Sequence, residues 1–228
     1  MADSNVHAFH RPLTAQQAVL AELRRAMLAG ELTPGSQIVQ EAIAERLGVS
    51  RVPIREALRI LEGEGQVIYV PHHGYSVAEL NLDELLEIQR IRELLEPEVT
   101  RKTLRQLGDE DLARMREYFE KMEEASVSGD IAAMNTFHLQ FHFTLFEGAD
   151  MPRLIRILRQ LWRASDPYRA LYHGDDSARA ASQADHLAIL RLSTARDTDQ
   201  LLEVLWTHRE HTIERLRGPL SSRRTIAN

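Results

Sequence analysis

Two histidines four residues apart, His138 and His142, carry the clearest chemical signal in this chain. They lie in the segment F-H-L-Q-F-H-F. If this segment is helical, both imidazoles project from one face of the helix. Two imidazoles at this spacing can bind one metal ion, as they do in metalloprotease helices. Aromatic residues line the adjoining face, so the pair would border a hydrophobic core, where a purely structural role for the histidines is the alternative interpretation.

Two further histidines lie inside later apolar segments, His186 in A-D-H-L-A-I-L and His208 in W-T-H-R-E-H. One continuous helix would hold them about 30 Å apart, because each residue adds about 1.5 Å. A break between residues 194 and 198 would let two helices run antiparallel and bring the two side chains together. His211, one turn beyond His208, competes for the same role. The other histidines are expected to lie away from any metal site: His7, His10, His72, His73 and His173.

Three arginines at four-residue spacing, Arg51, Arg55 and Arg59, define a second possible site. Ser50 is a suitable N-cap before them, since its hydroxyl can accept a bond from a free amide of the first turn. Pro53 falls in that turn, where its missing N–H costs little. A helix that begins with exposed arginines suits the DNA major groove, where arginine bonds guanine or a phosphate. A solvated basic surface is the alternative.

The segments around these arginines predict a small DNA-binding domain. Residues 40–47 predict a preceding helix, and Gly48 permits the sharp turn between the two helices. Strands are expected at 66–70 and 75–78, on either side of a turn at 71–74. The pattern is therefore a helix-turn-helix followed by a β-hairpin wing.

Helices are expected before and after this unit. A capping box formed by Thr14 and Gln17 predicts a first helix that runs to about residue 28. After a short joint at residues 81–83, only helices are expected, with Pro167 kinking or ending the fourth of them. These later helices are predicted at residues 83–106, 109–127, 129–146, 151–167, 177–195 and 198–216.

The predicted fold class is therefore mainly α, with an N-terminal winged helix-turn-helix and an all-α helical bundle. The winged domain is expected at residues 13–80 and the bundle at residues 81–220, with flexible tails at 1–12 and 221–228. Because the joint is short, the two domains are expected to pack against each other.

The composition of the chain excludes several classes of protein. The 228 residues carry a net charge of −6, and residues 1–80 contain seven arginines against nine acidic residues. This balance excludes a nonspecific binder coated in positive charge, so DNA binding requires arginines gathered on one face. The absence of cysteine excludes disulfides and thiolate metal ligands. No apolar run is long enough to span a membrane and the N-terminus resembles no signal peptide, so a cytoplasmic protein without a membrane partner is expected.

Three segments in the first third of the chain resemble the winged helix of the GntR family of bacterial transcription regulators. They read L-T-P-G-S-Q-I, L-G-V-S-R-V-P-I-R-E-A-L-R-I-L-E-G-E-G and H-G-Y-S-V. The resemblance implies a homodimer on a pseudo-palindromic DNA operator. It also implies that the DNA contacts come from the recognition helix and the tip of the wing, at Ser50, Arg51, Val52, Pro53, Arg55, Arg59, His73 and Gly74.

The remainder resembles the FCD effector domain of the FadR-like branch of that family. Many such domains hold a divalent metal with D-x-x-x-H and two later histidines, which His142, His186 and His208 match. His138 stands where the family usually has Asp or Asn. Four imidazoles suit zinc or nickel better than manganese or magnesium.

The same resemblance implies a small-molecule effector, which we expect to be an organic acid whose carboxylate meets the metal or an arginine. Arg92 lies in R-E-L-L-E-P, which matches an R-x-x-L-E pattern of these domains, and it is either structural or part of the pocket. The other candidates for effector binding are polar or amphipathic residues near the expected pocket: Arg163, Tyr168, Arg169 and Tyr172.

Three functions are consistent with these residues. The first is a repressor-type transcription regulator whose operator affinity is modulated by metal and effector. The second is a constitutive DNA-binding protein in which the histidines are only structural. The third is a metallohydrolase, which would lack an evident general base because no H-E-x-x-H is present and Asp185 is expected to point away from His186.

Overall fold

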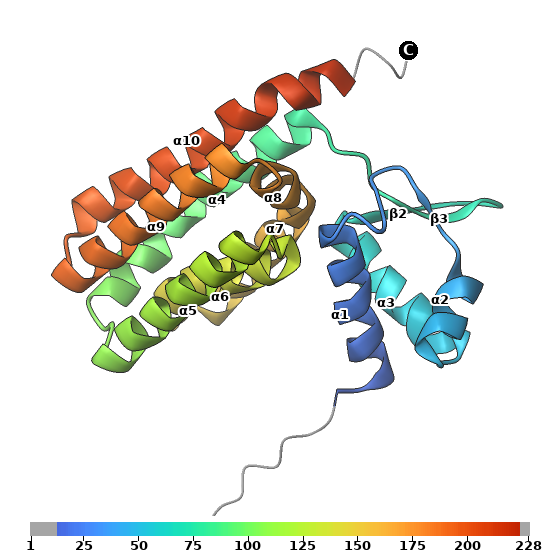
Figure 1. Cartoon of the computed structure of the whole chain (residues 1–228). Coiled ribbons are helices and arrows are strands. Elements are labelled where there is room, and N and C mark those ends of the chain that lie inside the picture. The colour runs from blue at the N-terminus through green and yellow to red at the C-terminus, as the bar shows by residue number, and fades with distance from the viewer. Residues whose placement is uncertain (1–12, 224–228) are drawn as a thin grey trace, which may run out of the picture.

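The computed structural model describes residues 13–223, so the tail predicted at 1–12 and residues 224–228 lie outside the described part of the chain. The described residues form a small winged domain and a larger helical domain, which lie side by side (Figure 1). The predicted fold class, mainly α with a winged helix-turn-helix, is confirmed.

The winged domain begins with the predicted capping box, in which the Thr14 side chain and the Gln17 side chain each bond the other residue's backbone N–H. Helix α1 (Ala15–Leu28) packs on α3 (Arg51–Gly63). Helix α2 (Gln40–Leu47) comes directly before α3 in the chain. Gly48 takes a left-handed conformation, with φ of 63°, at the end of α2. A glycine adopts this conformation without steric strain, which explains the tight turn into α3.

The wing is a three-stranded antiparallel sheet in the order β1-β3-β2. Strands β2 (Val67–Val70) and β3 (Gly74–Val77) form the predicted hairpin. The short strand β1 (Gln37–Ile38) was not predicted, because two residues carry too little periodicity to reveal a strand. It pairs with β3, and Ile38 joins the core of the domain opposite Tyr75.

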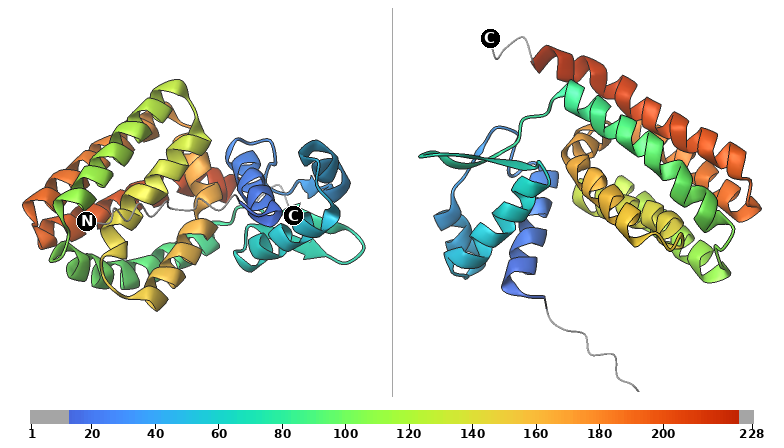
Figure 2. Two further views of the ribbon diagram at one scale, coloured as in Figure 1. Left: turned by 90° about the horizontal axis from the view of Figure 1, so that it is seen from below. Right: turned by 180° about the vertical axis from the view of Figure 1, so that it is seen from behind.

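The helical domain is built from α4 (Leu82–Leu104), α5 (Asp109–Ser128), α6 (Ile131–Glu147), α7 (Pro152–Ala164), α8 (Asp166–His173), α9 (Asp176–Ala195) and α10 (Thr198–Arg223). Figure 2 shows α10 running beside α4. Helix α9 packs on α10 and α5, and α5 packs on α6. The core lies between these layers and includes Phe141, Phe146 and Trp162, all essentially inaccessible.

Two features of this domain differ from the prediction. The fourth helix ends at Ala164, and Pro167 lies in the first turn of the separate short helix α8. The last helix continues beyond residue 216 to Arg223, through Gly218 and Pro219, so residues 221–223 of the predicted C-terminal tail are helical. Burial of Leu216 and Leu220 against α4 and α8 accounts for this extension, because tertiary packing outweighs local helix propensity.

A buried carboxylate, Glu96, ties three helices of the bundle together. It accepts hydrogen bonds from Arg92 Nε at 2.8 Å, from Trp162 Nε1 at 2.8 Å and from Arg209 Nη1 at 2.6 Å. These partners belong to α4, α7 and α10. Burial acts to raise the pKa of Glu96, but the two guanidinium groups and the Trp162 N–H outweigh it and lower the pKa. Arg92 therefore has a structural partner on its own helix.

The two domains are joined by direct contacts. The buried side chain of Gln66, at the start of the hairpin, donates to the carbonyl oxygen of Arg163 at 2.6 Å. In the linker, the Asn81 N–H donates to the Tyr168 hydroxyl at 3.1 Å, and this hydroxyl donates to Glu84 at 2.8 Å. Hydrogen bonds across this short joint therefore connect the winged domain and the linker to α7 and α8.

Within the described residues, none of the helices combines the length and the apolar character that a membrane crossing requires.

The Glu96 network generates a stability prediction. Glu96→Gln should lower the free energy of unfolding by about 3–5 kcal/mol, because it leaves Arg92 and Arg209 buried without a counter-charge. Urea denaturation followed by circular dichroism measures the change. Glu98→Gln, an exposed position on the same helix, is the matched control and should be nearly neutral. Equal stability of the two variants would contradict the central role of Glu96.

Candidate functional site

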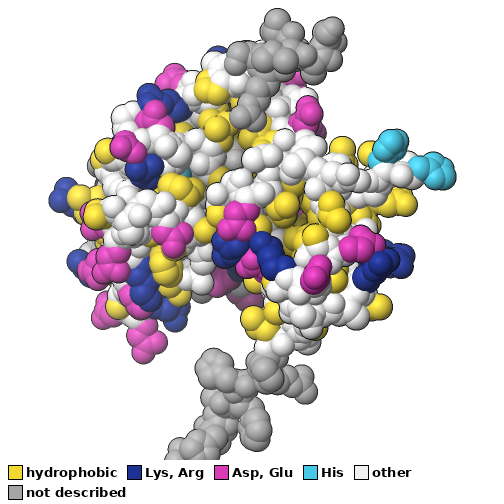
Figure 3. Space-filling view, turned by 45° about the vertical axis from the view of Figure 1, so that its right-hand side comes forward, with side chains coloured by type: hydrophobic (Ala, Val, Ile, Leu, Met, Phe, Trp, Pro, Cys, Tyr) yellow, Lys and Arg dark blue, Asp and Glu magenta, His cyan; other side chains and the backbone are white. Residues whose placement is uncertain are grey.

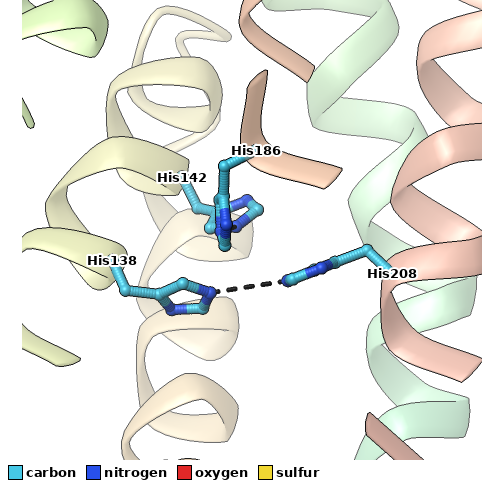
Figure 4. A group of neighbouring side chains, drawn as sticks. All are labelled: His138, His142, His186 and His208. Atoms are coloured by element: carbon cyan, nitrogen blue, oxygen red, sulfur yellow. Dashed lines mark hydrogen bonds between the residues drawn. The ribbon is translucent and has the colours of Figure 1, made fainter. Parts of the chain in front are cut away.

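Four histidines converge in the interior of the helical domain. His138 and His142 lie on α6, His186 on α9 and His208 on α10. One ring nitrogen from each lies within 4.8 Å of those of the other three. Figure 4 shows the four rings pointing into one space between these helices. All four side chains are buried.

The distances between ring nitrogens fit a shared metal ion. His142 Nε2 lies 3.1 Å from His186 Nε2, and His138 Nε2 lies 3.5 Å from His208 Nε2. Zinc binds histidine nitrogen at about 2.0–2.1 Å, so nitrogens that share one ion must lie roughly 3–4 Å apart. The donor set consists of four neutral nitrogens, which suits zinc and nickel.

Outer contacts orient two of the rings. His186 Nδ1 lies 2.6 Å from the carbonyl oxygen of Ser182, and His208 Nδ1 lies 3.1 Å from Asp185 Oδ2. A proton on each Nδ1 leaves the Nε2 lone pair free toward the centre of the cluster, as is usual for metal-bound histidine. The Nδ1 atoms of His138 and His142 are buried and have no hydrogen-bond partner.

The interior keeps three of these imidazoles neutral. Burial above all, and then the neighbouring histidines, hold the pKa of His138, His142 and His186 well below its ordinary value. Neutral imidazole is the form that binds a metal. His138, His142 and His186 are therefore held in the form that binds a metal at neutral pH.

Three residues near the cluster bear on the sequence interpretation, and one prediction was wrong. The carboxylate of Asp185, which was expected to point away from His186, contacts His208 and His211. His211, the competing candidate for the role of His208, is half-exposed and lies outside the cluster. His173 was expected to be peripheral, yet it is buried, with its ring centroid 5.5 Å from that of His138 and its Nδ1 3.2 Å from Asn135 Oδ1. The turn of α8 toward α6 brings it there, and local sequence does not reveal that turn.

The five candidate effector residues separate into two groups. Arg92 and Arg169 stack on the Trp162 ring, at 3.9 and 5.0 Å from its centroid. This ring also lies 4.7 Å from that of His142, so it stands between the arginines and the histidines. The other three lie farther out: Tyr168 and Tyr172 pack in a separate apolar cluster with Leu85 and Leu216, and Arg163 is only partly buried. The sequence pattern does not indicate that Trp162 lies beside the histidines.

The predicted DNA-contacting arginines share one groove. Arg51, Val52, Arg55 and Arg59 of α3 line it together with Tyr69 and Tyr75 of the wing and Gln40 and Glu41 of α2, and its volume is about 560 Å³. The three arginines and Val52 are exposed, whereas Ile54, Leu58 and Leu61 of the same helix are fully buried. Arg51 pairs with Glu41 at 2.9 Å, and Tyr69 is half-exposed, two contributions that the sequence pattern had not indicated.

Other predicted residues flank this groove. Ser50 occupies the N-cap position of α3, but its side chain makes no capping hydrogen bond, so the predicted hydroxyl cap is absent. Pro53 lies in the first turn of α3 and is partly exposed. Gly74 has φ of 84° at the end of the hairpin turn, which permits the wing to bend. Histidine side chains form the outer tip of the wing (Figure 3), where His72 and His73 are exposed.

Known proteins share this combination of elements. Residues 15–77 match the family described as bacterial regulatory proteins, gntR family, and residues 87–211 match the FCD domain. The chain belongs to the GntR family of bacterial transcription regulators with an FCD effector domain, as its sequence motifs predicted, and it is a regulator and not an enzyme.

Individual relatives agree with this assignment. The HTH-type transcriptional regulator McbR of Escherichia coli (strain K12) is 30% identical over 178 residues, which cover 78% of this chain and 79% of the relative. The Uxu operon transcriptional regulator of the same organism is 29% identical over 220 residues, covering 88% and 86%. The solved structure of E. coli McbR/YncC has a TM-score of 0.80 with 25% identity, covering 91% of this chain and 99% of that one.

Proposed function

We propose that this regulator binds a pseudo-palindromic operator as a homodimer and that its operator affinity responds to a divalent metal and a small carboxylate effector. The observation that carries the proposal is the presence, in one chain, of an arginine-lined recognition groove and a buried cluster of four histidines. The direct hydrogen bonds across the domain joint provide a route between the two sites.

In the DNA-binding role, Arg51 and Arg55 at the start of α3 read base edges, and Arg59 contacts the DNA backbone. Ser50, Val52 and Pro53 approach the same groove, and His73 and Gly74 bring the wing to the minor groove or to phosphates. The exposed arginines on one face of α3 support this assignment. Since the chain as a whole is acidic, DNA binding must rest on these specific contacts and not on a general electrostatic attraction between protein and DNA.

This role generates a DNA-binding prediction. Arg55→Ala should weaken binding to an operator selected from random DNA by about 5- to 150-fold, which corresponds to roughly 1–3 kcal/mol. Fluorescence anisotropy titration at fixed salt measures the affinity. Arg105→Ala, an exposed position in the helical domain, removes the same charge and should leave the affinity unchanged. Unchanged affinity in an Arg51→Ala, Arg55→Ala double variant would refute the assignment.

Dimerisation follows from the small number of bases that one recognition helix can reach. A two-fold symmetric pair of α3 helices doubles the base contacts, and half-sites then repeat about one helical turn apart. We expect multi-angle light scattering of the DNA complex to give the mass of the duplex plus twice the chain mass of 26.1 kDa. A mass of one chain per operator, at concentrations that saturate binding, would rule out this arrangement.

We propose that His138, His142, His186 and His208 hold one divalent metal, zinc or nickel. A six-coordinate ion would keep two positions open for water or an effector carboxylate, and a four-coordinate zinc would be closed and structural. When bound, the metal would supply an electrophilic site for anionic ligands. The chain's own contribution is to hold four neutral nitrogens together from α6, α9 and α10.

This site generates a metal-binding prediction. His142→Ala and His186→Ala should lose zinc or nickel after dialysis against trace metal, as elemental analysis would show, and the metal-loaded wild type should melt at a higher temperature than the metal-free protein. His211→Ala is the matched control and should retain the ion, because His211 lies outside the cluster. Full occupancy in His142→Ala would show that this constellation is wrong.

The pH dependence of the same site has a defined sign. Protons compete with metal for imidazole, so affinity falls as pH decreases. Because burial lowers the pKa of His138, His142 and His186, this loss should occur below the ordinary imidazole pKa of about 6.5.

A further inference from the structure

A glutamate of α2, Glu41, lies among the arginines of the recognition groove. It lines the groove together with Arg51 and Arg55 of α3, and its Oε1 lies 2.9 Å from Arg51 Nη1. The side chains of Glu41 and Arg51 are 58% and 65% exposed. Figure 1 shows α2 on the side of the winged domain away from the helical bundle, where a DNA duplex can approach. The groove therefore presents a carboxylate to DNA as well as its arginines.

The winged domain has few unpaired cations for a polyanion to bind. Three arginines outside the groove form ion pairs with glutamates: Arg24, Arg25 and Arg46. Arg51 inside the groove pairs with Glu41. Within the described residues, this leaves Arg55 and Arg59 as the arginines of the winged domain that have no carboxylate partner. A glutamate in this groove therefore removes a substantial part of the attraction for DNA.

The stability of the fold does not account for Glu41. An ion pair between two exposed side chains contributes little to folding, because water and salt screen both charges. Neither Glu41 nor Arg51 belongs to the apolar core of the winged domain. On DNA, the carboxylate repels phosphate and neutralises one arginine, which lowers the affinity for every sequence alike. A contact with base edges can offset this loss, because only base edges differ between sequences.

The major groove offers a carboxylate one well-matched base. Cytosine presents its N4 amino group as a donor, and glutamate can accept a hydrogen bond from it. Guanine presents two acceptors, O6 and N7, which suit the fork of an arginine. Adenine also presents an amino group, but its N7 acceptor lies beside that group and repels a carboxylate. A carboxylate and a guanidinium held side by side, as in Glu41 and Arg51, therefore complement a cytosine beside a guanine.

We propose that Glu41 is a specificity-determining residue that selects a cytosine in each operator half-site, beside the guanine that Arg51 contacts. This proposal rests on the proposed function, in which α3 occupies the major groove, and it adds a base-reading residue from α2. The ion pair keeps the carboxylate and the guanidinium adjacent, so the two bases that they read are adjacent as well.

Selection of operators from random duplex DNA tests this assignment on the full-length protein. Wild type, Glu41→Gln, Glu41→Ala and the control Glu45→Gln are compared. Glu45 is exposed on the same helix and is not among the residues that line the groove, so its variant removes the same charge elsewhere. Wild type and Glu45→Gln should select the same cytosine. Glu41→Gln should select adenine at that position, because glutamine bonds adenine N6 and N7. Glu41→Ala should show no preference there.

Affinities measured at fixed salt give the size of the effect. Replacement of the selected cytosine by adenine should weaken wild-type binding by about 5- to 150-fold. The same replacement should strengthen binding by Glu41→Gln and leave binding by Glu41→Ala unchanged. Glu41→Ala should also bind nonspecific DNA more tightly than wild type does, because its Arg51 is free to contact phosphate.

The alternative roles of Glu41 give different results. If all four proteins select one consensus and both Glu41 variants bind every duplex more tightly, Glu41 acts through its charge alone and the proposal is overturned. Loss of the guanine preference in the Glu41 variants, without a change at any cytosine, would show that Glu41 only positions Arg51. Both results leave the proposed function intact. Failure of wild type to select any sequence would instead refute the proposed function and this proposal together.

Discussion

The helical domain depends on one buried carboxylate. Glu96 neutralises Arg92 and Arg209 and holds the indole N–H of Trp162, so α4, α7 and α10 meet at a single point. A charge in the interior is tolerated only when it is paired and hydrogen-bonded, and this pairing therefore fixes the distances between three helices. Trp162, held in this way, is packed against His142 and so forms one wall of the histidine cluster. The position of the four histidines thus depends on an ion-pair network that lies outside the cluster.

The histidine cluster and the recognition groove lie in different domains, and α8 lies between them. One face of this short helix carries Arg169 and His173 toward the cluster, and another carries Tyr168 toward the linker. A further hydrogen bond, from Gln66 to the Arg163 carbonyl, joins the base of the wing to the end of α7. Helix α1 also contacts α6 and α8, so the two domains meet over several elements. Helix α8 therefore contacts both the winged domain and the helix that carries His138 and His142.

The two domains also differ in where they place their arginines. The chain is acidic overall, yet its recognition helix exposes three arginines on one face and buries aliphatic residues on the other. One of these arginines, Arg51, forms an exposed ion pair with Glu41 of α2. In the helical domain, by contrast, Arg92, Arg169 and Arg209 are buried, and each pairs with a buried carboxylate.

Local sequence determined much of this protein. Helix periodicity and capping residues predicted α1, the limits of α2, and the turn at Gly48, since these features depend on neighbours within a few residues. The i,i+4 spacing of His138 and His142 likewise follows from one helix, and family motifs supplied His186 and His208 as their partners. Only the tertiary structure decided what depends on contacts distant in sequence: the strand β1, the extension of α10, the burial of His173, and the placement of Trp162, Glu96 and Arg169 around the cluster. The same limit explains why Ser50 was assigned a capping bond that it does not make, because a suitable residue type does not determine its rotamer. The residues predicted from sequence are those whose neighbours lie on the same or the adjacent turn, and the remainder are positioned by helices that meet across the fold.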